Sequence, residues 1–244
     1  IDSTTALISI IYVSNETGAI NDINKIAKLV KDINPRVIFH SDGVQAFMKI
    51  PFKPSNDIDL YSISAHKINA LKGVGAILKN KRVQNLKPLI YGGGQENNLR
   101  SGTENVFGIK VFEYAFATHL QTLVEDYNNA KNLKQLFISK LTAQDYTIIS
   151  SENSSPYVIC LSATGLRGEV IQHMLEQDGI IIGTGSACSS KHSHSRMLKE
   201  IGYDDKVLDG VIRISFSTES TLEEGITACQ ILNNVARKLK GIMK

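Results

Sequence analysis

Two side chains in the first half of the chain have the types and positions needed to hold an aldehyde cofactor. Lys67 ends the segment Ser62-Ile63-Ser64-Ala65-His66-Lys67, which continues an apolar, strand-like run. Asp42 stands at the end of the preceding strand-like run. A lysine at a strand end can form a Schiff base with an aldehyde, and an acid that meets a pyridinium nitrogen makes the cofactor an electron sink. The pair therefore indicates pyridoxal phosphate (PLP) chemistry.

Three polar residues near this pair can support the cofactor. Ser64 and His66 alternate with Lys67, and both can donate hydrogen bonds to phosphate oxygens. Gln45, one helical turn beyond Asp42, can donate to a phenolate oxygen. Taken alone, Lys67 is an ordinary surface charge, and Asp42 is an ordinary turn residue in Ser-Asp-Gly. The combination of Lys67 with Asp42 upstream favours a cofactor site over these ordinary interpretations.

Cys188 is the candidate nucleophile. It lies in the loop from Gly183 to Ser190, whose small residues favour exposure, and Lys191 and His192 can lower its pKa. The other cysteines, Cys160 in an apolar strand and Cys229 on an apolar helix face, are expected in the core. No second cysteine pair accompanies the nearby histidines, so no metal site is predicted.

Arg213 is the candidate ligand for a substrate carboxylate. It lies within Val211-Ile212-Arg213-Ile214-Ser215, where the ordinary interpretation is an outward-facing residue on a half-exposed strand. Its guanidinium fork suits a bidentate contact with an amino-acid carboxylate. Arg100 is a weaker second candidate. Asn15 can bind the same carboxylate or the phenolate oxygen, although Asn15-Glu16-Thr17-Gly18 also has the composition of a simple turn.

The elements expected in the first half place these residues at one edge of a sheet. Alternating strands and helices favour an α/β fold with a mostly parallel sheet, in which ligands lie at the carboxyl ends of strands. A helix is expected from Ile23, capped by Asn21 or Asp22. The expected strands are Ala6–Val13, Val37–His40, Ile58–Ile63 and Gly75–Leu78.

A mostly helical stretch from Thr103 to about Ala143 is expected to lead into a second domain. We therefore predict a PLP-binding large domain over residues 1–122 and a smaller α+β domain with the cysteine loop over residues 123–244. Strands are expected at Tyr146–Ile149, Tyr157–Leu161, Ile180–Ile182 and Val211–Phe216, and helices at Gly168–Gln177, Ser195–Ile201 and Leu222–Leu239.

Composition excludes several classes of function. The 244 residues carry a net charge of +3 with dispersed basic residues, which argues against binding to nucleic acid. No apolar run approaches membrane-spanning length, so no membrane association is expected. Three widely spaced cysteines suit a reducing cytoplasm rather than a disulfide framework. Because the chain begins with Ile1 almost directly in a strand, its beginning is expected to be missing.

Seven stretches together resemble the cysteine desulfurases of the class V, fold-type I PLP family. They occur in the family's order along nearly the whole chain: Ser14–Gly18, His40–Gln45, Ser62–Lys67, Gly92–Glu96, Arg100–Thr103, Gly185–Ser190 and Ile212–Ser215. The resemblance implies a PLP-dependent transferase fold whose large domain is only partly present. It also implies a homodimer with shared active sites.

The resemblance also assigns roles at the cofactor. Lys67 would hold PLP and move the Cα proton, while Asp42 would bind the ring nitrogen. Gln45 would bind the phenolate oxygen, and Ser64 and His66 the phosphate.

Further roles follow for the subunit contact and the substrate. Thr103 would reach the cofactor phosphate of the partner subunit. Arg213 and Asn15 would bind the carboxylate of L-cysteine, and Cys188 would take its sulfur as a persulfide, leaving L-alanine. The sulfur would pass to an acceptor protein, such as an iron–sulfur scaffold or a tRNA thiolation enzyme.

The chain also departs from the family pattern. The family's phosphate-cradling turn and its histidine stacked on the cofactor ring precede the matching part and have no counterpart here. Ala70-Leu71 replaces a common Gly-Pro pair, and Ser217 replaces a common glycine. Two alternatives therefore stay open: a selenocysteine lyase, and a non-catalytic fragment or truncated paralogue that serves as a docking scaffold for a sulfur carrier.

Overall fold

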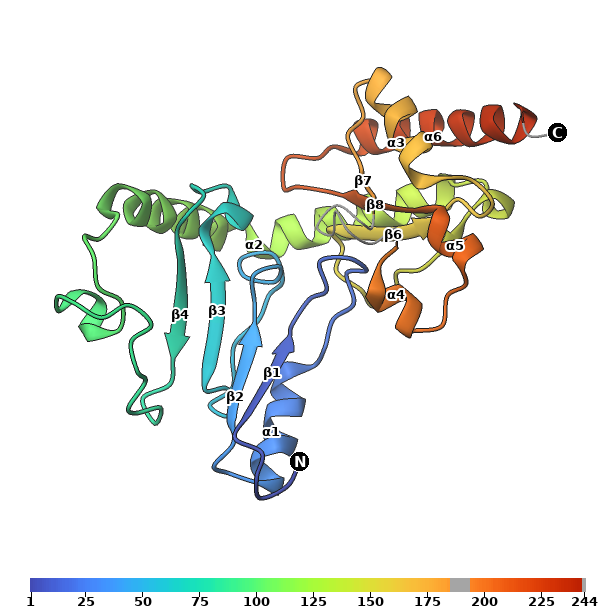
Figure 1. The fold of residues 1–244 in the computed structure, drawn as a ribbon. Coiled ribbons are helices and arrows are strands. Elements are labelled where there is room, and N and C mark those ends of the chain that lie inside the picture. Colours follow the sequence, from blue (N-terminus) through green and yellow to red (C-terminus); the bar gives the residue numbers. More distant parts are fainter. Residues whose placement is uncertain (185–193, 243–244) are drawn as a thin grey trace. The chain divides into compact units, whose positions relative to one another are not determined.

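The structure, a computed structural model, describes residues 1–184 and 194–242 (Figure 1). The chain forms two compact units. Unit 1 comprises Ile1–Val13 and Asn21–Val124, and unit 2 comprises Ser14–Ile20 and Glu125–Lys244. One boundary falls inside the long helix α2 (Val106–Lys140). The short segment Ser14–Ile20 follows the first strand of unit 1 in sequence, yet it packs in unit 2.

Unit 1 is built on a sheet in the order β1-β2-β3-β4. The strands are β1 (Leu7–Ile11), β2 (Ile38–Asp42), β3 (Leu60–Ser64) and β4 (Gly75–Lys79). β1, β2 and β3 are parallel, and β4 runs antiparallel to β3. The predicted α/β fold with a mostly parallel sheet is confirmed. β2 extends to Asp42, two residues beyond the predicted strand end, so the acid is the last residue of the strand.

Helix α1 (Ile23–Ile33) packs beside β1 and β2, as Figure 1 shows. Its buried residues Ile23, Ala27 and Val30 recur at helical spacing and form one apolar face. The Asp22 side chain accepts a hydrogen bond from Lys25 N at 3.1 Å and caps the helix, as the sequence predicted.

A buried carboxylate, that of Asp59, lies at the amino end of β3 and holds several elements of unit 1 together. Asp59 accepts hydrogen bonds from Lys31 Nζ at 2.5 Å and from Phe39 N at 2.7 Å, and it also pairs with Arg82. Burial alone would raise the pKa of Asp59, but the hydrogen bonds from Arg82, Lys31 and Phe39 outweigh burial and lower it. The network ties α1, β2 and the segment after β4 to the start of β3.

Unit 2 contains a second sheet, in the order β5-β6-β8-β7, whose paired strands are all antiparallel. Its strands are β5 (Thr147–Ile148), β6 (Val158–Ser162), β7 (Gly183–Thr184) and β8 (Val211–Ser215). Its helices, besides the end of α2, are α3 (Gly168–Gln177), α4 (Arg196–Glu200), α5 (Asp205–Asp209) and α6 (Leu222–Ile242). Short 3₁₀ turns complete the two units: η1 (Ala65–Ile68), η2 (Gln95–Asn98) and η3 (Ala143–Asp145).

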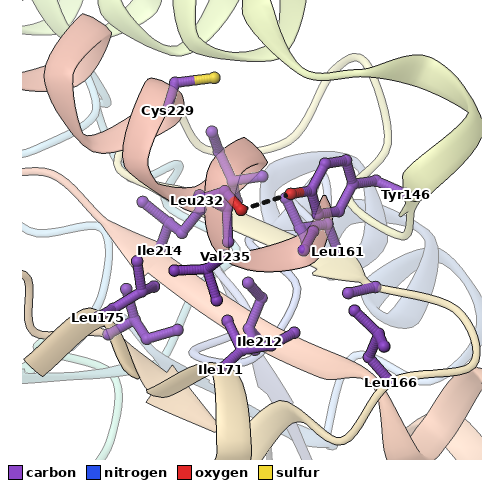
Figure 2. Packing of buried hydrophobic residues seen from close by; sticks show 14 of the residues in the cluster. Tyr146, Leu161, Leu166, Ile171, Leu175, Ile212, Ile214, Cys229, Leu232 and Val235 are labelled. Atoms are coloured by element: carbon purple, nitrogen blue, oxygen red, sulfur yellow. Dashed lines mark hydrogen bonds between the residues drawn. The ribbon is translucent and has the colours of Figure 1, made fainter. Parts of the chain in front are cut away.

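The core of unit 2 lies between the sheet, α3 and α6 (Figure 2). Ile171 and Leu175 from α3 meet Ile212 from β8 and Leu232 from α6. The Tyr146 hydroxyl satisfies its hydrogen bond within this core by donating to Leu232 O at 3.0 Å. Burial of these apolar side chains provides the main driving force for folding of the unit.

One predicted element is wrong and one was not predicted. Ile180–Ile182 is not a strand; pairing with β8 begins instead at Gly183. Gly179 follows the C-terminal end of α3, and its positive φ of 76° reverses the direction of the chain. The next three residues do not pair with β8, and Ile182 is buried in the core of the unit. The short helix α5 lies between Ile201 and Val211, where the sequence analysis predicted no element. No helix among the described residues has the length and apolarity that crossing a membrane requires.

Candidate active site

Adjacent parallel strands bring Asp42 and Lys67 to the same edge of the sheet in unit 1. Asp42 is the last residue of β2, and its Cα partner on β3 is Ser62. β3 ends at Ser64, and Lys67 follows in η1. Because β2 and β3 run in the same direction, Asp42 at the carboxyl end of β2 and Lys67 just beyond that of β3 lie at the side of the sheet where ligands of α/β sheets bind.

The turn after Asp42 is closed against the ring of Tyr61. Gly43 N donates to Ser62 O at 2.9 Å, and Val44 N donates to Asp42 Oδ1 at 2.9 Å. A Cβ atom on Gly43 would lie 1.9 Å from Tyr61 Cζ, and Tyr61 is only 4% exposed. The buried ring therefore requires glycine at position 43. Gln45 follows in the same turn and is half-buried.

η1 fixes the backbone of Lys67 through its apolar neighbours. Ala65 and Ile68 are buried, whereas Lys67 is half-buried and His66 is exposed. Asn69 closes the turn in the left-handed region with φ of 62°, and its N–H donates to Ala65 O. The two predicted phosphate ligands lie side by side, since Ser64 Oγ and His66 Nδ1 are 2.8 Å apart.

Lys49 is a cationic residue of this region that the sequence reasoning missed. Burial, followed by the nearby Lys67 ammonium, lowers the pKa of Lys49 to about 8. Two lysines within electrostatic reach of each other form a positive environment that an anionic group would stabilise. The lysine occurs in the mostly apolar stretch Phe47-Met48-Lys49-Ile50, which was the available sequence signal for burial.

His40 lies on the same strand as Asp42, two residues earlier, and links three strands. Its Nδ1 lies 2.7 Å from Ser9 Oγ on β1, and its Nε2 lies 2.8 Å from Ser62 Oγ on β3. Burial lowers the pKa of His40, and the Asp42 carboxylate opposes that effect. The neutral ring and the two hydroxyls therefore form a cross-strand network on the face of the sheet that carries Asp42.

Thr103 and Arg100 lie in an exposed segment of unit 1. Arg100 Nη1 donates to Ser101 O at 2.9 Å, and Ser101 Oγ donates to Gly93 O at 2.8 Å, which closes the loop between them. Thr103 is exposed. The structure thus places neither side chain against Asp42 or Lys67.

Arg213 and Asn15 meet within unit 2. Arg213 Nη1 donates to the backbone carbonyl of Asn15 at 3.0 Å, and the side chain is half-buried. The guanidinium also lies close to the backbone of Gly183, where a Cβ atom would be 3.1 Å from Nη2 and 3.4 Å from Nε. One nitrogen is therefore held by the Asn15 carbonyl, and the lack of a side chain at Gly183 leaves space beside Nη2 and Nε of the guanidinium.

Cys188 lies outside the described residues. The other two cysteines are buried, as predicted. Burial, followed by the Glu16 carboxylate, raises the pKa of Cys160 to about 12, and burial raises the pKa of Cys229 to about 11. Both thiols are thus protonated at neutral pH and unsuited to nucleophilic attack. Among the described residues, no cluster of histidine, cysteine and acidic side chains could hold a metal ion.

Comparison with known families gives a consistent match. The family model "Aminotransferase class-V" matches residues 1–226. "Cysteine desulfurase IscS" of Dictyoglomus turgidum is 35% identical over 243 residues, covering 98% of this chain and 61% of the relative. "NifS/IcsS protein homolog" of Lactobacillus delbrueckii subsp. bulgaricus is also 35% identical, over 92% of this chain and 59% of the relative. The chain therefore spans about three fifths of the length of these relatives.

Solved structures agree with this match. A protein titled "NIFS-LIKE PROTEIN" superposes with a TM-score of 0.88 at 32% identity, covering 98% of this chain and 63% of that one. A NifS-like protein from Rickettsia africae superposes with a TM-score of 0.85 at 28% identity, covering 97% of this chain and 63% of that one.

Proposed function

The chain belongs to the class V aminotransferase family, and on that premise we propose that it acts as a cysteine desulfurase. The reaction converts L-cysteine to L-alanine and passes the sulfur through Cys188 to an acceptor protein. The single observation that carries this proposal is the delivery of Asp42 and Lys67 to one sheet edge by adjacent parallel strands. The names of the relatives support cysteine as the substrate.

The cofactor of this family is PLP, and the residues of unit 1 fit it. Asp42 Oδ1 is bonded to Val44 N, and among the described residues no donor is bonded to Oδ2, which can accept from a ring nitrogen. The Ser64–His66 pair and the positive environment of Lys49 and Lys67 suit a phosphate. When bound, PLP draws electrons from the Cα atom of an amino-acid substrate.

The remaining steps fall to the side chains of the protein. Lys67 would hold PLP before the substrate binds, and its Nζ, once released by the substrate amine, would take the Cα proton as a general base. Arg213 binds the substrate carboxylate through its Nε–Nη2 edge. The Cys188 thiolate attacks the substrate sulfur, so that an S–S bond forms while the Cβ–S bond breaks. The electron pair left on Cβ takes a proton, which gives L-alanine and a Cys188 persulfide.

The test is an absorption spectrum of the protein with added PLP, recorded before and after L-cysteine, together with measurement of L-alanine. Lys67→Ala should remove the visible band of the lysine-bound cofactor and abolish L-alanine production. Normal turnover by Lys67→Ala would refute the assignment of this lysine. Faster turnover of L-selenocysteine than of L-cysteine would assign the protein as a selenocysteine lyase instead. Absence of both the visible band and turnover in the unsubstituted protein would favour a scaffold without catalysis.

Two further parts of the proposal concern partners. The sulfur acceptor is an iron–sulfur scaffold or a tRNA thiolation enzyme, and the persulfide-loaded protein should transfer ³⁵S to one of them. A homodimer would bring the exposed Thr103 to the cofactor phosphate of the partner subunit. Thr103→Ala should then weaken PLP binding in the dimer only, as measured by PLP titration across a range of protein concentrations.

A further inference from the structure

Glu16 and Ser195 form a contact within unit 2 that the roles above do not explain. The Ser195 hydroxyl donates a short hydrogen bond to Glu16 Oε2 at 2.5 Å. Ser195 Oγ also accepts from Leu198 N at 3.3 Å and thereby caps α4. Ser195 is only 8% exposed, so without the carboxylate its buried hydroxyl loses its acceptor.

Glu16 belongs to a tight turn from Ser14 to Ala19. Ser14 Oγ accepts from the backbone N–H groups of Glu16 and Thr17, both at 3.2 Å. Ser14 N donates to Ala19 O at 2.9 Å, which closes the turn. On the other side of the turn, Thr17 O accepts from Ser150 Oγ, in the segment after β5, at 2.6 Å. These contacts shape the turn and fix one end of it.

On the side of α4, the turn depends chiefly on Glu16. Among the described residues, the other hydrogen bond between this turn and α4 is the weak contact from Ser14 Oγ to Met197 Sδ at 4.0 Å. The charge-assisted bond between Glu16 and Ser195 is the stronger of the two. Loss of the Glu16 carboxylate should therefore leave the turn free to shift away from α4.

The residue beside Glu16 provides the link to Arg213. The carbonyl of Asn15 accepts from Arg213 Nη1 at 3.0 Å, and this bond holds one side of the guanidinium. A shift of the turn moves that carbonyl and allows the guanidinium to rotate. Rotation changes the direction of the Nε–Nη2 edge, and a bidentate contact with a carboxylate depends on that direction.

We propose that Glu16 is a positioning residue for the substrate carboxylate: through Ser195 it fixes the turn whose Asn15 carbonyl orients Arg213. The inference rests on the proposed function, because that function makes Arg213 the carboxylate ligand. It adds a link from α4 through Ser195, Glu16 and Asn15 to the guanidinium. Glu16 itself touches neither substrate nor cofactor in this arrangement.

The test uses nuclear magnetic resonance of the Arg213 Nε–H group in the whole 244-residue chain. In the free protein, Glu16→Ala should shift this signal and broaden it, and Glu16→Gln should restore part of the change because the amide oxygen can still accept from Ser195. L-alanine then serves as a carboxylate probe, with L-alaninamide as the matched compound that lacks a carboxylate. Glu16→Ala should weaken L-alanine binding about tenfold, or about 1.4 kcal/mol, and leave the weaker binding of L-alaninamide unchanged.

Two controls separate positioning from a general loss of stability. Glu152→Gln, an exposed substitution in the same unit, should change neither the Arg213 signal nor L-alanine binding. Ser195→Ala should reproduce the effect of Glu16→Ala, and the double variant should be no worse than either one, because both remove the same contact. If Glu16→Ala does not fold, Glu16→Gln and Ser195→Ala carry the test.

The possible failures are distinguishable. An unchanged Arg213 signal in free Glu16→Ala, or additive effects in the double variant, would overturn the role of Glu16 whatever the protein binds. Failure of L-alanine to move the Arg213 signal in the unsubstituted protein would overturn the proposed carboxylate ligand, and with it the proposed function at this residue.

Discussion

Asp59→Asn should destabilise unit 1 by about 3 kcal/mol at pH 7. The Asp59 carboxylate is 1% exposed and accepts from Lys31, Arg82 and the backbone N–H of Phe39. Asparagine keeps one carbonyl oxygen as an acceptor but loses the charge. Lys31, whose side chain is 12% exposed, is then left as a largely buried cation without its counter-charge. Removing one partner of a buried ion pair typically costs about 3–5 kcal/mol, and the retained acceptor places this substitution at the lower end.

The pH dependence follows from the lowered pKa of Asp59. A carboxylate with a folded-state pKa below its unfolded value stabilises the protein above the unfolded value, about 3.9. That stabilisation is lost as the pH falls through the folded-state pKa. The unsubstituted protein should therefore lose this contribution in acid, while Asp59→Asn, which has no carboxyl group at this position, should not. The difference in stability between the two proteins should shrink below about pH 4.

Amide hydrogen exchange of β2 and β3 is the suitable assay, because it reports the opening of unit 1 without assuming that both units unfold together. Asp32→Asn is the matched control, since Asp32 pairs with Lys28 on the exposed surface of α1 and should contribute little. Equal exchange rates for Asp59→Asn and the unsubstituted protein at pH 7 would refute the reasoning. So would a stability difference that stays constant from neutral pH to pH 3.

Four further substitutions test the site. Gly43→Ala should displace Tyr61 or the Asp42 turn and reduce PLP affinity at least tenfold, as measured by PLP titration, whereas unchanged affinity would contradict the packing argument. Lys49→Met should weaken phosphate binding several-fold, so that the affinity for PLP falls more than that for the phosphate-free aldehyde pyridoxal; equal losses would exclude a role in phosphate binding. Cys188→Ser should keep the spectral response to L-cysteine but yield no persulfide, whereas Cys160→Ser should retain turnover. If mass spectrometry mapped the persulfide to Cys160, the assignment of Cys188 as the nucleophile would be wrong.

Patterns that act over a few residues made much of the fold predictable. α3 was predicted with the bounds that the structure has, Gly168–Gln177, because its apolar residues recur at helical spacing. The Asp22 cap and the apolar runs of β1 to β3 are equally local. Asp42 and Lys67 could be placed at one sheet edge because parallel strands end on the same side.

Contacts between segments distant in the sequence could not be predicted in this way. No local pattern shows that Gly43 must face the ring of Tyr61, or that Lys49 lies within electrostatic reach of Lys67. Glu16 had the appearance of a turn residue, and its bond to Ser195 spans most of the chain. The short strand β7 was misplaced because three consecutive isoleucines before it suggested a strand, whereas the strand forms where the chain pairs with β8.

The location of Asn15 has a consequence for the chemistry. Residues Ser14–Ile20 follow β1 of unit 1 in sequence but belong to unit 2, so Asn15 and Arg213 meet inside a single unit. The proposed carboxylate ligand, Arg213, is therefore positioned by contacts other than those that hold Asp42 and Lys67 in unit 1. A substitution in unit 1 such as Lys67→Ala should abolish chemistry without disturbing the orientation of Arg213. On the proposed function, substrate anchoring and cofactor binding should therefore be separable, because the residues proposed for each are held by the packing of different units.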